Sequence, residues 1–186
     1  DHQSPYGIAS KLISNEALIL AMFDTPELVH ELMAICTQAT IDTIEAMRAW
    51  VGNDAPFVLN HVDPNPDGGL ILWDDFISVL SPELHREFCL PYNQQLYDRY
   101  GRGHLHTCGP NFPRYLDAIL AHDIRSIDII IMRDMSKTRA DVLLLHERAC
   151  NAGVSLHGSL TTCATNLTSP KTPKVAADDD LVVAMA

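Results

Sequence analysis

Apolar side chains recur with a helical period in two segments that begin in the same way. Thr25-Pro26-Glu27 combines an N-cap hydroxyl, a proline at the first helical position and an acid in the first turn. The apolar residues that follow predict a helix to about Trp50. Ser81-Pro82-Glu83 repeats the device, and apolar residues at steps of four predict a second helix that ends at Gly101. Pro91 lies inside this second pattern and predicts a kink there.

Short apolar runs rich in β-branched residues predict strands between the helices. The segment "LILWDDF" favours either a loop or a further short strand. Helices are expected over residues 112–123 and 139–153, and Thr172-Pro173 could open one more. The four predicted strands cover residues 56–62, 103–108, 126–132 and 154–160.

The alternation of strands and helices predicts an α/β fold with a parallel sheet. The pattern leaves open whether the sheet is a barrel or doubly wound. No Gly-x-Gly-x-x-Gly follows any predicted strand, so a dinucleotide-binding fold has no support.

Composition narrows the classes of partner. The 186 residues, 47% of them hydrophobic, are enough for one globular domain, in which residues 161–186 are the least legible part. A net charge of −11 speaks against nucleic acid or an anionic membrane surface as partner. Five cysteines at irregular spacings do not predict a disulfide framework, and neither a signal peptide nor a membrane span is visible. We therefore expect a cytoplasmic protein.

The predicted strand "GHLHTC" carries the most specific chemistry in the chain. His104, His106 and Cys108 alternate along it, so they share one face, and Cys108 is its last residue before Gly109-Pro110. Ligands of parallel α/β proteins bind at this end of the strands. Imidazole with thiolate suits zinc better than magnesium or calcium, which makes His106 and Cys108 candidate zinc ligands. His104 is expected to be a packed core imidazole.

A His-x-Cys pair is also common in an ordinary α/β core, and a nucleophilic Cys108 paired with His106 is a further possibility.

Other polar residues follow predicted strands and are candidates to line the same cavity. "WDD" is also typical of a solvated loop or a helix cap. The candidates for binding a cofactor at these strand ends are His61, Asp63, Asp74, Asp75 and His157.

Three motifs together resemble the uroporphyrinogen decarboxylase superfamily. They are Ser81-Pro82-Glu83, Leu90-Pro91-Tyr92 and His106-Thr107-Cys108-Gly109, and the likeness extends over residues 5 to about 160. The resemblance is closest to the branch of corrinoid-dependent, zinc-containing methyltransferases of the coenzyme M type. It implies a TIM barrel about twice as long as this chain. Residues 1–186 would then be a single-domain fragment, roughly the second half of such a barrel.

The same resemblance implies zinc-dependent transfer of a methyl group from a corrinoid carrier protein to a thiol. That branch supplies a further cysteine ligand downstream, for which Cys163 is the candidate, although its sequence context does not match. The main alternative is a metal-free decarboxylase of porphyrin biosynthesis, with Arg125, Arg133 and Arg139 as candidates to bind tetrapyrrole carboxylates. A third possibility is a non-catalytic partial barrel with a binding role. A half barrel exposes strand edges, so an oligomer or the rest of the barrel is an expected partner.

Overall fold

A five-stranded parallel sheet forms the centre of the molecule, with the strands in the order in which they occur along the chain. The computed structural model describes residues 2–53, 69–108, 112–132 and 139–161. Within these residues the sheet is open and does not close into a barrel. The α/β fold with a parallel sheet is therefore confirmed. The strands are β1 (His2–Gln3), β2 (Ile71–Trp73), β3 (Gly103–Cys108), β4 (Ile124–Met132) and β5 (Ser155–Thr161).

Helices precede or separate the strands as the sequence predicts. The long helix and the helix that begins after Ser81 are both confirmed, and the second is broken at Cys89, two residues before Pro91. "LILWDDF" contains the short strand β2 rather than loop alone. The helices are α1 (Pro5–Leu12), α2 (Asn15–Asp24), α3 (Pro26–Val51), the 3-10 turn η1 (Asp75–Val79), α4 (Pro82–Phe88), α5 (Leu90–Tyr100), α6 (Phe112–Ile119) and α7 (Arg139–Asn151).

Helices α1 and α2 were not predicted, although each has a cap that the sequence contains. The Ser4 hydroxyl accepts a hydrogen bond from Gly7 N–H, and the Ser14 hydroxyl accepts one from Ala17 N–H. The predicted strand over residues 56–62 and the helix expected after Thr172 lie outside the described residues.

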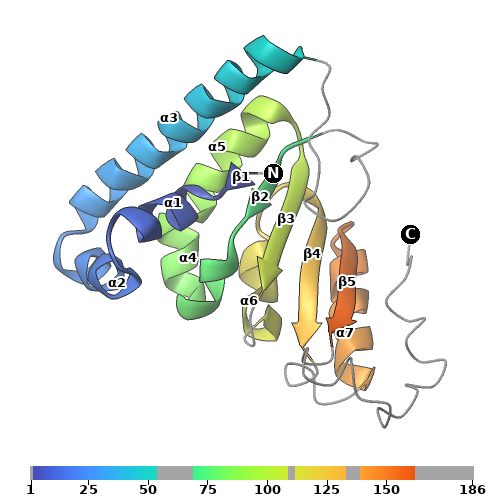
Figure 1. The fold of residues 1–186 in the computed structure, drawn as a ribbon. Coiled ribbons are helices and arrows are strands. Elements are labelled where there is room, and N and C mark those ends of the chain that lie inside the picture. The colour runs from blue at the N-terminus through green and yellow to red at the C-terminus, as the bar shows by residue number, and fades with distance from the viewer. Residues whose placement is uncertain (1, 54–68, 109–111, 133–138, 162–186) are drawn as a thin grey trace, which may run out of the picture.

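The two faces of the sheet differ in chemistry because side chains alternate along each strand. One face is apolar, and α5, α6 and α7 lie behind it (Figure 1). Leu72, Leu105 and Ile127 on this face are fully buried in one core cluster with residues of α5 and α6. The other face is polar along β3 and β4, where His104 is in register with Ser126 and His106 with Asp128.

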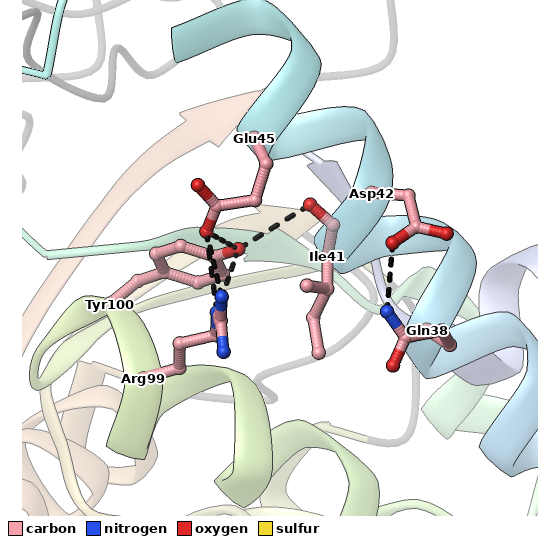
Figure 2. Close-up of polar contacts among 6 residues, drawn as sticks. All are labelled: Gln38, Ile41, Asp42, Glu45, Arg99 and Tyr100. Carbon is pink, nitrogen blue, oxygen red and sulfur yellow. Dashed lines mark hydrogen bonds and ion pairs between the residues drawn. The ribbon is translucent and has the colours of Figure 1, made fainter. Parts of the chain in front are cut away.

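Helix α3 is fixed to α5 by a polar group as well as by apolar packing. Glu45 Oε1 accepts hydrogen bonds from the Tyr100 hydroxyl at 2.8 Å and from Arg99 Nη2 at 3.1 Å (Figure 2). These hydrogen bonds lower the pKa of Glu45, and the bond from Tyr100 has the larger effect. Helix α3 therefore has a fixed position over the outer surface of the helix layer. Among the described residues no helix has the length and apolar character that a membrane crossing requires.

Candidate functional site

The polar face of the sheet holds His106 between an indole and a carboxylate. The His106 ring stacks on Trp73 of β2, with ring centroids 4.4 Å apart and an interplanar angle of 27°. On its other side, His106 Nδ1 lies 2.6 Å from Asp128 Oδ2 of β4. Both neighbours follow from strand register, because Trp73, His106 and Asp128 are directly paired across β2, β3 and β4. The ring is thus held in one orientation.

The contact with Asp128 also sets the chemistry of the two ring nitrogens. A carboxylate accepts a hydrogen bond, so Nδ1 carries the hydrogen and Nε2 of the neutral ring keeps its lone pair. Nε2 lies 3.8 Å from Asp75 Oδ1, at the start of η1. We call His106, Asp128, Asp75 and Trp73 the His106 cluster. Its imidazole is arranged either to ligate a metal through Nε2 or to move a proton there.

Exposure rises across the His106 cluster in one direction. The side chain of His106 is 7% exposed, that of Asp128 is 22% exposed and that of Asp75 is 41% exposed. The cluster is therefore reached from the Asp75 side, and a ligand would approach Nε2 rather than Nδ1.

The structure brings some of the predicted site residues together. Asp75 and His106 share the cluster, and the backbone of His157 on β5 is in register with Asp128. Cys108 ends β3 two residues beyond His106, with its backbone in register with Ile130. The side chains of Cys108 and His157 lie outside the described part of the structure. The remaining candidates, His61, Asp63 and Cys163, lie outside the described residues.

Asp74 lies apart from the His106 cluster. Its side chain is 0% exposed and accepts a hydrogen bond at 3.2 Å from Asn93 Nδ2 of α5, on the helix side of the sheet. Burial raises the pKa of Asp74 to about 7, while the hydrogen bond from Asn93 acts in the opposite sense. The interpretation of "WDD" as a solvated loop is therefore wrong for Asp74, and the two acids do not face one cavity.

A second polar cluster surrounds Asp74. One ligating atom from each of Asp74, His85 and Cys89 lies within 4.8 Å of the other two. We call these three residues the buried triad, since all are 0% exposed. Burial lowers the pKa of His85 well below its usual value and raises that of the Cys89 thiol well above it. The three groups are thus a carboxyl, an imidazole and a thiol in an environment that disfavours their charged forms.

Several of these residues were missed by sequence reasoning. Asp128 was counted within an apolar strand, although a single acid in such a run is itself a signal. His85 and Cys89 are four residues apart, a spacing that places two side chains on one helical face. His104, expected in the core, is only partly buried, and its Nδ1 contacts the Ser126 hydroxyl.

Comparison with known proteins assigns the chain to a family. The family model described as uroporphyrinogen decarboxylase (URO-D) matches residues 2–173. The chain belongs to the URO-D family. Its five parallel strands accordingly represent part of a URO-D-type TIM barrel, which is not closed in the described residues.

Curated relatives match this URO-D family chain in sequence over only part of its length. Proteins named uroporphyrinogen decarboxylase from Xanthomonas campestris pv. campestris strains B100, 8004 and ATCC 33913 are 35% identical to it over 106 residues. That segment covers 54% of this chain and 26% of each relative. The match therefore spans about a quarter of the relatives' length. No solved structure gave a significant match.

Proposed function

We propose that His106 and Cys108 are zinc ligands in a URO-D-type protein that transfers a methyl group from a corrinoid carrier protein to a small thiol. The observation that supports this most is the 2.6 Å contact between His106 Nδ1 and Asp128 Oδ2. Zinc-binding histidines usually donate their second ring N–H to a carboxylate, which orients the ring and strengthens the ligating nitrogen. His106 has this arrangement, with Nε2 facing the accessible side of the cluster.

The residues present fit such an ion. Cys108 follows His106 by two positions on β3, so a strand geometry separates the two residues by about 6–7 Å along one face. Asp75 adds an oxygen donor 3.8 Å from His106 Nε2. Imidazole, thiolate and carboxylate are all zinc ligands, and a catalytic site takes three protein ligands and keeps one position for substrate. When bound, zinc would act as a Lewis acid that lowers the pKa of the substrate thiol.

Each residue of the His106 cluster then has a defined task. Asp128 Oδ2 holds the Nδ1 hydrogen and fixes the ring. Trp73 forms an apolar wall on one face of the imidazole, which limits access of water there. Asp75 Oδ1, on the open side, supplies the oxygen donor to the ion. Cys163 remains a candidate for a further ligand.

A second candidate function is decarboxylation of a tetrapyrrole, and the printed names of the relatives favour it. Such a pocket needs cations for the substrate carboxylates. Arg125 is exposed at the second position of β4, opposite to the end at Met132 where ligands of parallel sheets bind. The side chains of Arg133 and Arg139 are not among those described. His106 is instead flanked by two carboxylates, which suits a cation better than a polyacid.

Zinc content and activity of the full-length protein discriminate between these functions. We expect His106→Ala and Cys108→Ala each to remove about one zinc per chain and to abolish methyl transfer from methylcobalamin to a thiol. The control is His104→Ala, which removes an imidazole two residues earlier on the same strand face. Unchanged zinc content in both variants, or porphyrinogen decarboxylation that both variants retain, would contradict the proposal. If the wild type shows neither methyl transfer nor porphyrinogen decarboxylation, a binding role is favoured.

A further inference from the structure

The buried triad brings together donors from three separate parts of the chain. Asp74 follows β2, His85 lies on α4, and Cys89 lies at the break between α4 and α5. Each is 0% exposed, yet their ligating atoms lie within 4.8 Å of one another. Three different polar groups converging on one point in a core is unusual, because burying polar groups costs free energy unless they are satisfied.

His85 is the least satisfied member of this group. Neither of its ring nitrogens has a hydrogen-bond partner among the described residues. An imidazole always has a donor or a lone pair at each nitrogen, so both positions are left without a counterpart. The ring packs against His122 at a centroid distance of 5.2 Å, which fills space but satisfies neither nitrogen.

Asn93 contributes a further unsatisfied polar atom next to the triad. Its Nδ2 donates to Asp74 Oδ2 at 3.2 Å and lies 3.4 Å from His122 Nε2. His122 Nδ1 is 3.0 Å from the carbonyl of Ile119, so Nδ1 donates there and Nε2 accepts from Asn93. Both amide hydrogens of Asn93 are thereby used, and the orientation of the amide is fixed. Its Oδ1 is buried and has no partner among the described residues.

We propose that Asp74, His85 and Cys89 bind a zinc-type divalent ion as a structural site. An imidazole nitrogen, a thiolate sulfur and a carboxylate oxygen are each donors that zinc takes in proteins. The ion also balances charge, since Zn²⁺ with one thiolate, one carboxylate and a neutral imidazole has no net charge. Zinc–ligand distances are about 2.0–2.3 Å, so atoms within 4.8 Å need only small side-chain movements to close on one ion.

The site would stabilise the part of the sheet that carries the His106 cluster. Asp74 N–H donates to the carbonyl of His106 at 2.9 Å, and the Thr107 hydroxyl donates to the carbonyl of Asp74 at 3.0 Å. An ion held by Asp74, His85 and Cys89 therefore connects the ends of β2 and β3 to α4 and α5. This role is independent of the proposed zinc at His106 and Cys108.

Cobalt binding separates the two sites, because a thiolate ligand to Co²⁺ gives a charge-transfer absorption that oxygen and nitrogen ligands do not give. The full-length protein is used with Cys108→Ala, Cys150→Ser and Cys163→Ala, of which the first and third remove the candidate thiol ligands of the His106 site. The second change removes an exposed thiol 3.4 Å from His146 Nε2 that could bind metal adventitiously. We expect this protein to bind one Co²⁺ with a thiolate band and tetrahedral d–d absorption. Adding Cys89→Ala should abolish the band.

The matched control is Cys36→Ala, which removes another buried free cysteine and should leave the cobalt spectrum unchanged. If Cys89→Ala prevents folding, zinc K-edge absorption of the Cys108→Ala, Cys150→Ser, Cys163→Ala protein provides the second readout. One sulfur with nitrogen and oxygen neighbours supports the site. A shell without sulfur, or a thiolate band that survives Cys89→Ala, overturns it. Failure of the methyl-transfer proposal leaves all these expected results unchanged.

Discussion

Asp74 and Asp75 are neighbours in sequence, yet they belong to opposite sides of the sheet. Asp75 is 41% exposed and lies beside an imidazole whose other nitrogen contacts a second carboxylate. Asp74 is 0% exposed and lies beside a thiol and an imidazole that has no hydrogen-bond partner among the described residues. The difference shows that position in the turn, rather than residue type, decides the chemistry of each acid. It also separates an accessible cluster of polar groups from a fully buried one.

The largest expected effect is on the pH dependence of folding in metal-free protein. Burial raises the pKa of Asp74 from its ordinary 3.8 to about 7 in the folded chain. Between these values the folded chain holds a proton that the unfolded chain has lost, so the stabilising contribution is present below pH 4 and is lost as the pH rises to 7. The loss amounts to about 4 kcal/mol, since one pKa unit corresponds to about 1.4 kcal/mol. Asp74→Asn removes this dependence.

The pKa shift of His122 changes stability with pH in the opposite direction to that of Asp74. The Asp74→Asn variant is therefore needed to isolate the contribution of Asp74. Burial lowers its pKa from 6.5 to about 4, so its contribution to stability grows as the pH rises through that interval. The two effects oppose each other in the wild type. Urea denaturation with a chelator present should show Asp74→Asn gaining stability relative to wild type between pH 4 and 7. A constant difference between the two proteins over that range would exclude a raised Asp74 pKa.

A smaller effect is expected at the accessible site. Asp128→Asn keeps an oxygen that can accept from His106 Nδ1 but removes its charge, and such changes weaken zinc binding by about 10–100-fold. Competition with a chromophoric chelator, in a Cys89→Ala background, measures the affinity. Ser126→Ala is the control, because Ser126 lies on the same face of β4 as Asp128 and its hydroxyl contacts His104 instead of His106. Equal losses in both variants would show that packing of the face, and not orientation of His106, is responsible.

The regular elements were predictable because their signals are local. The helical period after Thr25, the Pro91 break and the alternating strand "GHLHTC" each need only neighbouring residues to be interpreted. Strand β3 accordingly has the predicted bounds, and α3 ends within a residue of the predicted Trp50. Helix α2 was missed because only Leu18 and Met22 of its ten residues are buried. Helix α1 was missed because its eight residues are too few to show a helical period.

The sites were less predictable because they depend on register and on tertiary contacts. The pairing of His106 with Asp128 follows from the alignment of β3 and β4, which neither strand specifies alone. The separation of Asp74 from Asp75 depends on a turn at the end of β2. His85 and Cys89 have helical spacing, but only the tertiary structure brings them within 4.8 Å of Asp74.

The smallest expected effect concerns the two Pro-Glu helix starts, which look equivalent in sequence. The Ser81 hydroxyl accepts a hydrogen bond from Leu84 N–H at 3.2 Å, with extended backbone at Ser81. Thr25 has φ −146° and ψ 60° and makes no side-chain cap bond. Ser81→Ala should therefore cost about 1 kcal/mol of unfolding free energy, measured by urea denaturation, and Thr25→Ala distinctly less. Because α4 carries His85, zinc-loaded protein should resist Ser81→Ala better than chelated protein does. If Ser81→Ala lowers the unfolding free energy equally with and without metal, the α4 cap is not energetically coupled to metal binding at the buried triad.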